Sequence, residues 1–219
     1  MKTDILYSFR RCPYAIRVRW ALLICKIKIE IREVDLKNKP LDFINISSTK
    51  TVPILLKKNN EVIEESLDII IWALSESAEK NIKNLYIPKD TEEEILEIIF
   101  ENDRSFKYHL DRFKYSIRFS ESDEDFHFLE ALKIIKKWNK QLKISKWLIG
   151  DNLTIADWCI WPFVRQFKIA CISQKKTNYF DDPIKEWLGY FEKHQNFEIL
   201  MHKYEKWNPS TKRYYFPIN

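Results

Sequence analysis

The sequence predicts an α/β domain followed by an all-α domain. Over residues 1–77, apolar runs of strand length alternate with helical patterns in the order β-α-β-α-β-β-α. A polar segment then interrupts the pattern over residues 78–90, as expected of a linker between domains. Residues 91–219 have a helical pattern throughout. A chain of 219 residues is long enough for one large domain or two small ones.

Short apolar runs mark the strands of the first domain, and amphipathic stretches mark its helices. Strands are expected at residues 5–7, 29–34, 52–56 and 62–63, and helices at 13–26, 41–46 and 66–74. Helical crossovers predict that the early strands pair in parallel. The turn Asn59-Asn60 predicts a hairpin between the last two strands, which adds an antiparallel edge.

The second domain is predicted to contain four helices. They are expected from Thr91 to about Arg118, from Ser122 or Asp123 to about Leu142, from Thr154 to about Ala170, and from Pro183 to His194. Thr154 and Asp157 have the spacing of a capping box, and Leu153 and Trp158 occupy the positions of a hydrophobic staple. This segment therefore predicts the start of a buried helix.

Composition excludes several classes of function. No apolar run has the length of a membrane span, and the first residues lack a signal-peptide core, so we expect a cytoplasmic protein with no membrane partner. The net charge of +5 is spread along the chain, which argues against nucleic-acid binding. Only two glycines occur, so phosphate-binding loops are absent. The four histidines and four cysteines lack metal-ligand spacing, so we expect no metal and no disulfide framework.

Cys12 is the strongest candidate for chemistry. It follows a short strand and precedes Pro13, which suits the first turn of a helix because its missing N–H is not needed there. A helix N-terminus favours an anion, and nearby cations lower the pKa of a cysteine from about 8.5 to roughly 3.5–7.5. The cations beside Cys12 in the sequence are Arg10, Arg11, Arg17 and Arg19. The sequence therefore predicts a reactive thiol; the alternative is a small structural cysteine at a strand end.

Four segments resemble the cytosolic glutathione transferases. They are residues 11–15 (Arg-Cys-Pro-Tyr-Ala), 51–55 (Thr-Val-Pro-Ile-Leu), 64–67 (Glu-Glu-Ser-Leu) and the capping segment 150–158. The resemblance implies an N-terminal thioredoxin-like domain and a C-terminal helical bundle. The Cys-Pro-Tyr-Ala element is similar to the omega-class and glutaredoxin-like branch, whose residue at this position is cysteine. Residues 112–115 and 161–167 look more like a bacterial group of the family.

The resemblance implies a glutathione site built around Cys12. It assigns contacts with glutathione to Pro13, Tyr14, Lys39, Lys50, Val52, Pro53, Glu65 and Ser66. Val52-Pro53 would carry a cis peptide beside the cysteinyl unit, although proline at the start of an edge strand is an alternative. Glu65 and Ser66 would bind the γ-glutamyl end at a helix N-terminus, with Glu64 in reserve; the alternative for Ser66 is a simple cap.

The glycine carboxylate of glutathione requires a cation. Both Lys39 and Lys50 are candidates, and the sequence does not choose between them. The family often has a glycine between the Lys50 position and Thr51, and this chain lacks it. A second substrate is expected between the domains. Its candidate contacts are Phe106, Tyr108, Arg112, Tyr115 and Trp161.

The sequence favours a one-cysteine mechanism. Ala15 stands where a dithiol glutaredoxin has its resolving cysteine, so Cys12 would form a mixed disulfide with glutathione that a second glutathione releases. Two alternatives remain open. In conjugation, Tyr7 or Ser8 would hold the thiolate of glutathione. In a non-catalytic member of the fold, the chain would serve as an interaction protein. The resemblance also implies a homodimer.

Overall fold

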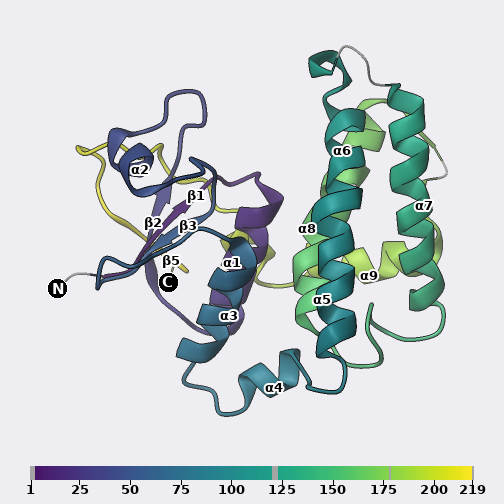
Figure 1. Ribbon diagram of the computed structural model, residues 1–219, viewed down its shortest axis with the longest axis horizontal. Coiled ribbons are helices and arrows are strands. Elements are labelled where there is room, and N and C mark those ends of the chain that lie inside the picture. The colour runs from purple at the N-terminus through teal and green to yellow at the C-terminus, as the bar shows by residue number, and fades with distance from the viewer. Residues whose placement is uncertain (1–2, 120–122, 178, 219) are drawn as a thin grey trace. The chain divides into compact units, whose positions relative to one another are not determined.

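Two units make up the fold, each with its own core. The computed structural model describes residues 3–119, 123–177 and 179–218. One unit comprises Met1–Lys83 together with Gln195–Asn219, and the other comprises Asn84–His194. The first is built on a sheet and the second is helical (Figure 1). The predicted fold class is confirmed.

A five-stranded mixed sheet forms the centre of the first unit. Its strands are β1 (Ile5–Ser8), β2 (Ile29–Glu33), β3 (Ile54–Leu56), β4 (Val62–Ile63) and β5 (Tyr214–Phe216). They lie in the order β4-β3-β1-β2-β5. β1 and β2 pair in parallel, whereas β3, β4 and β5 each pair antiparallel to a neighbour.

Helices cover the sheet. α1 (Pro13–Ile24) and α3 (Ser66–Glu76) pack side by side (Figure 1), and α2 (Leu41–Ile46) contributes Phe43 to a separate cluster. In that cluster Phe43 packs with Tyr7 of β1 and with Val52. Leu6 and Tyr7 are consecutive strand residues and both are fully buried, so the sheet is covered on both faces.

The pairing of β3 corrects one prediction. We expected the early strands to be parallel, but β3 runs antiparallel to β1, with Tyr7 opposite Ile54. A parallel neighbour needs a crossover that carries the chain back along the sheet, and the six-residue α2 is too short for that. The chain therefore enters β3 at the end where β1 finishes. This places Val52 next to Cys12.

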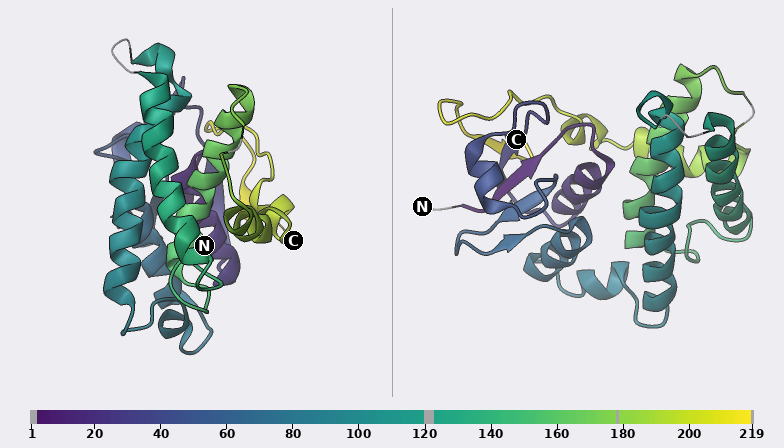
Figure 2. Two further views of the ribbon diagram at one scale, coloured as in Figure 1. Left: turned by 90° about the vertical axis from the view of Figure 1, so that its right-hand side faces the viewer. Right: turned by 45° about the horizontal axis from the view of Figure 1, so that its top comes forward.

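The C-terminal segment corrects another prediction. We expected residues 91–219 to form one all-helical domain, but Gln195–Asn219 belongs with the sheet. The segment contains the short helix α10 (Phe197–Leu200) and ends in β5, which pairs with β2 (Figures 1 and 2). Tyr-Tyr-Phe is a short β-forming run that finds its partner strand only through tertiary pairing.

The helices of the second unit follow the predicted pattern closely. They are α5 (Glu92–Glu101), the π-helix η1 (Asn102–Phe106), α6 (Lys107–Lys114), the 3₁₀-helix η2 (Ser116–Arg118), α7 (Glu124–Leu142), α8 (Ile155–Ser173) and α9 (Asp182–Glu192). The segment expected as one long helix from Thr91 is thus interrupted by a π-helical turn. In the predicted linker, residues Ile82–Tyr86 form the short helix α4.

Helix caps in this unit agree with the sequence. The side chain of Asp123 caps α7 by accepting from the Phe126 N–H at 3.0 Å, whereas Ser122 lies outside the described residues. Thr154 and Asp157 form the predicted capping box at the start of α8. Among the residues that the structure describes, no helix is both long and apolar enough to cross a membrane.

Candidate functional site

Cys12 lies where β1 ends and α1 begins. It is the N-cap residue of α1, with extended backbone angles, and Pro13 follows at the first helical position. Its N–H donates to the Phe9 carbonyl at 3.0 Å, which closes a tight turn between strand and helix. Its side chain is partly exposed and forms no disulfide. The predicted placement of this thiol at a helix N-terminus is confirmed.

Val52 meets the thiol from across the sheet. The Cys12 Sγ lies 3.5 Å from the Val52 carbonyl oxygen and donates to it as a thiol. The Val52-Pro53 peptide is cis, as predicted. The backbone of Val52 and the side chain of Cys12 therefore share one end of the sheet, where a bound thiol compound could contact both.

The arginines near Cys12 serve different purposes. Arg19 is buried and donates to the Arg10 carbonyl at 2.8 Å and to the Ser8 hydroxyl. Arg11 is exposed, with its guanidinium 5.6 Å from the centre of the Phe9 ring. Arg17 points instead toward α3. The charge of Arg19 interacts with that of ionised Cys12.

Ser66 opens α3 and is bound to Arg17. Two guanidinium nitrogens of Arg17 donate to the Ser66 Oγ, at 3.1 and 2.8 Å, and both residues are buried. The Arg17 guanidinium also lies 4.8 Å from the centre of the Tyr14 ring. Since Ser66 accepts both bonds, its hydroxyl hydrogen can still be donated to a ligand. The sequence analysis did not predict that Arg17 binds Ser66. Arg17 lies four residues before Ala21 on a buried face of α1, and that pattern does not indicate a partner on another helix.

Glu64 and Glu65 have separate environments. The Glu64 carboxylate accepts from the Ser48 N–H and hydroxyl, each at 2.6 Å, and these bonds lower its pKa. Glu64 therefore stabilises the loop before β3, and its carboxylate is not free to replace Glu65 in binding the γ-glutamyl end of glutathione. Glu65 is the N-cap residue of α3 and is exposed.

Lys39 and Lys50 lie together. The Lys39 Nζ donates to the Lys50 carbonyl at 3.0 Å. Lys50 has a positive φ of 53°, a conformation that normally favours glycine, and its N–H donates to the Ser47 hydroxyl at 2.7 Å. Lys50 thus lies in the loop immediately before Val52, and Lys39, which precedes α2, reaches that loop with its side chain.

The hydroxyls of Tyr7 and Ser8 are both bound inside the protein. Tyr7 donates to Asp42 at 2.9 Å and accepts from Arg32 at 2.7 Å, while Ser8 accepts from Arg19. Burial raises the pKa of Tyr7 well above its ordinary value, against the charge of Arg32. Both residues are almost fully buried, so neither hydroxyl is directed to solvent.

Two of the predicted second-substrate residues belong to the core. Phe106 packs against Trp138, with ring centres 5.0 Å apart, and Trp161 stacks on Phe191 at 5.2 Å. Phe106 and Trp161 are fully buried, so the prediction that they line a pocket is wrong. Their apolar rings fill the space between helices because burial stabilises them there.

The other three candidates lie at the surface of the helical unit. Tyr108 is 47% exposed, and the Arg112 guanidinium covers its ring at 3.6 Å from the ring centre. Tyr115 is partly exposed and lies 4.4 Å from the guanidinium of Arg118. They stay predictions for a second substrate.

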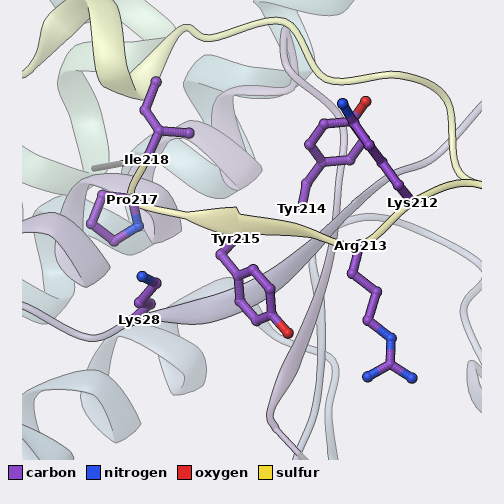
Figure 3. A pocket seen from close by; sticks show the side chains of 7 residues that line it. All are labelled: Lys28, Lys212, Arg213, Tyr214, Tyr215, Pro217 and Ile218. Carbon is purple, nitrogen blue, oxygen red and sulfur yellow. The ribbon is translucent and has the colours of Figure 1, made fainter.

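A separate hollow of about 380 Å³ lies along β5 (Figure 3). Its lining residues are Lys28, Lys212, Arg213, Tyr214, Tyr215, Pro217 and Ile218. In Figure 3, Lys28, Tyr215 and Arg213 lie on one side of the strand and Tyr214 and Lys212 on the other. None of the candidate glutathione-binding residues lines it. Charged side chains of this kind are common on edge strands, where they prevent pairing with another chain.

Comparisons with known proteins agree with this geometry. Residues 6–81 match the family model for the glutathione S-transferase N-terminal domain. An epsilon-class glutathione S-transferase from the housefly, Musca domestica, is similar with a TM-score of 0.75 at 19% identity, over 90% of this chain and 91% of the other. Glutathione transferase Omega 3C from Trametes versicolor has a TM-score of 0.74 at 15% identity, over 95% and 87%.

A third similar structure is that of Ure2p in complex with S-hexylglutathione. Its TM-score is 0.76 at 16% identity, over 92% of this chain and 99% of the other. Identities this low establish a shared fold. Residues 6–81, which include Cys12, therefore match the glutathione S-transferase N-terminal domain, and the chain as a whole has the fold of the glutathione transferases.

Proposed function

We propose that this chain is a glutathione-dependent thiol transferase that works through a Cys12–glutathione mixed disulfide. One observation carries the proposal: the Cys12 thiol is partly exposed at the end of β1, while the neighbouring hydroxyls of Tyr7 and Ser8 are bound internally. A glutathione thiolate would need one of those hydroxyls for support in conjugation. The cysteine itself is thus the better-placed group.

The reaction consists of two thiol–disulfide exchanges. The Cys12 thiolate attacks the glutathione sulfur of a glutathionylated substrate, the substrate's S–S bond breaks, and the released thiolate takes up a proton. The thiolate of a second glutathione then attacks the Cys12–glutathione disulfide. This step releases oxidised glutathione and regenerates Cys12. Since Ala15 cannot act as a resolving thiol, the second glutathione is required.

The remaining site residues support binding of glutathione in a defined orientation. The Ser66 hydroxyl and the N–H groups at the start of α3 suit the γ-glutamyl carboxylate, and Glu65 suits the ammonium. The Val52 backbone suits the cysteinyl unit. Lys39 or Lys50 suits the glycine carboxylate. We further propose small oxidised or glutathionylated molecules, including dehydroascorbate, as second substrates, and a cytoplasmic homodimer as the working form. Dehydroascorbate has no disulfide: the Cys12 thiol and one glutathione would supply its two electrons and two protons and form the same Cys12–glutathione disulfide, which a second glutathione then reduces.

An assay with glutathione and a small mixed disulfide tests the proposal. We expect Cys12→Ala to lose nearly all turnover because the attacking thiol is gone. Tyr7→Phe and Ser8→Ala, which remove the hydroxyls needed for conjugation, should keep thiol-transfer activity as long as they fold. If Cys12→Ala retains activity toward an electrophile while Tyr7→Phe or Ser8→Ala loses it, conjugation is the function.

The non-catalytic alternative makes a different prediction. An interaction protein of this fold that has lost glutathione binding should pass through immobilised glutathione without retention. The position of Ser66 and the cis Val52-Pro53 peptide favour retention. Failure of the wild-type chain to bind, with Cys12 reduced, would exclude both enzymatic readings.

A further inference from the structure

The turn that carries Cys12 is held by two hydrogen bonds to the backbone of Arg10. The N–H of Arg10 donates to the Glu33 Oε1 at 2.8 Å, and its carbonyl accepts from Arg19 at 2.8 Å. Both polar groups of one residue in a four-residue turn are therefore bound to side chains. Glu33 comes from the end of β2 and Arg19 from the middle of α1. The turn cannot shift unless these bonds break.

Each residue that grips the turn is itself bound to the C-terminal segment. The Arg19 Nε donates to the Leu200 carbonyl at 3.1 Å. The backbone carbonyl of Glu33 accepts from the Trp207 N–H at 2.7 Å. Figure 2 shows this yellow segment returning to the sheet. Residues from the two ends of the chain thus meet behind the Cys12 turn.

Burial makes this arrangement sensitive to substitution. Arg19 is 1% exposed and Glu33 is 8% exposed. Burial lowers the pKa of Arg19 to about 10 and raises that of Glu33, while the attraction between the two charges acts against both shifts. Arg19 remains a cation at neutral pH. It interacts with Cys12 when that thiol is ionised.

We propose that Arg19 and Glu33 are positioning residues for Cys12, and that the C-terminal segment, residues 195–218, holds both in place. Together they fix the Phe9–Cys12 turn and thereby the direction and reactivity of the thiol. This inference rests on the proposed function in that it takes Cys12 as the reactive group. It adds a role for the chain's C-terminal residues in the chemistry of an N-terminal cysteine.

The rate of Cys12 alkylation by iodoacetamide, followed by mass spectrometry from pH 5 to 9, tests the inference. The other thiols do not interfere: burial raises the pKa of Cys25 and Cys171 to about 12, and Cys159 is fully buried. We expect Glu33→Leu to lower the rate constant at pH 7 on the order of tenfold, because the freed turn moves the thiol away from the N-terminus of α1 and from Arg19, so that less of it is thiolate. Glu33→Gln should restore it, because the amide oxygen still accepts from Arg10.

The arginine makes a separate prediction. Arg19→Met should lower the rate and move the midpoint of the pH profile upward, because a nearby cation is lost. Arg19→Lys should keep the midpoint close to that of wild type, because the positive charge remains. Its rate should be several-fold lower, because one ammonium group cannot replace all the hydrogen bonds that the guanidinium donates. Lys185→Gln is the matched control: it removes one cation and breaks an exposed ion pair with Asp182 in the helical unit, and it should change neither quantity.

Equal rates and midpoints in wild type and folded Glu33→Leu and Arg19→Met would overturn the inference. If those variants do not fold, Glu33→Gln and Arg19→Lys decide, together with hydrogen exchange of the wild-type Arg10 amide. That amide should be protected from exchange like the amides of β1. Exchange as fast as in an exposed loop would contradict the hydrogen bond from Arg10 to Glu33. Iodoacetamide requires no glutathione, so a failure of the proposed function leaves this test intact.

Discussion

Ser66 contacts both the buried guanidinium of Arg17 and the candidate glutathione site at the start of α3. Its oxygen accepts two bonds from Arg17, which leaves the hydroxyl hydrogen to be donated at the start of α3, where a carboxylate would be stabilised by the helix N-terminus. One oxygen therefore satisfies a buried guanidinium and orients a donor. No other residue type of this size supplies both groups.

The substitution Ser66→Ala should act on binding and on stability. Loss of one charge-assisted hydrogen bond should weaken glutathione binding about tenfold. Loss of the acceptor for buried Arg17 should lower the free energy of unfolding by about 1–3 kcal/mol. Calorimetric titration with reduced glutathione and urea denaturation measure the two effects. Ser75→Ala, in the same helix, is the control, since Ser75 donates only to the Trp72 carbonyl. Equal affinities for both variants would contradict the assignment.

At the scale of elements, the start of α8 depends on one buried carboxylate. Asp157 accepts from the Leu148 and Thr154 N–H groups, each at 3.0 Å, and from the Trp187 indole at 2.8 Å. Burial raises its pKa to about 6, so it is ionised at neutral pH. The carboxylate thereby ties three segments of the helical unit together.

Substitutions at this cap should differ in cost. Asp157→Ala leaves several buried donors unsatisfied and should lower the free energy of unfolding by more than about 3 kcal/mol. Thr154→Ala removes one capping bond, to the Ala156 N–H, and should cost roughly 1 kcal/mol. Chemical denaturation at pH 7 provides both values. Equal stability of the two variants would contradict a central role for Asp157 at the start of α8.

A histidine pair links α6 to α7. The Nδ1 atoms of His109 and His127 lie 2.8 Å apart, so one must accept the proton that the other donates. Burial lowers the pKa of both, with further lowering of His127 by Arg112 and of His109 by His127. The other charged groups acting on the pair are Lys133, Glu130 and Asp123.

This pair should make stability depend on pH. A histidine with a lowered pKa binds protons less readily in the folded protein than in the unfolded chain. Its contribution to stability is therefore complete above the unfolded pKa of about 6.5 and is lost as pH falls below that value. We expect the melting temperature of wild type to fall more between pH 7 and pH 5 than that of His109→Gln/His127→Gln. The difference between the two curves is the relevant quantity because other groups also titrate there. Parallel curves would exclude the pair as its source.

For the whole molecule, the sheet-based unit is closed by the end of the chain. Phe216 of β5 is fully buried opposite Ile29, whereas its neighbour Tyr215 is 39% exposed. Phe216→Ala should therefore cost about 3–5 kcal/mol of unfolding free energy. Tyr215→Ala, a control on the same strand, should cost about 1 kcal/mol or less. Denaturation followed by far-UV circular dichroism measures both, and a harmless Phe216→Ala would show that β5 is dispensable.

The sequence predicted what local pattern determines. The first four strands, the three helices between and after them, and the capped helix at Thr154 each follow from periodicity or cap residues close together in the chain. β5 could not be predicted, because three residues pair with a strand near the other end of the chain. The direction of β3 was missed because it depends on how far α2 carries the chain, which periodicity does not tell.

The residues of the candidate site also fall into those that the sequence predicted and those that it did not. Cys12, Val52-Pro53 and Ser66 were found because their neighbours in the sequence are distinctive. Glu33 was missed because a carboxylate at the end of an alternating strand gives no sign of its partner at Arg10. Phe106 and Trp161 were wrongly assigned because aromatic residues at helical spacing serve cores and pockets alike.

The central claim is that Cys12 forms a covalent adduct with glutathione, and the intact mass of the protein tests it most directly. After incubation with oxidised glutathione at neutral pH, the account predicts a gain of one glutathionyl group, absent in Cys12→Ser and reversed by reduced glutathione. The three buried cysteines should remain unmodified. A wild-type mass that does not change, or an adduct that persists in Cys12→Ser, would contradict the account.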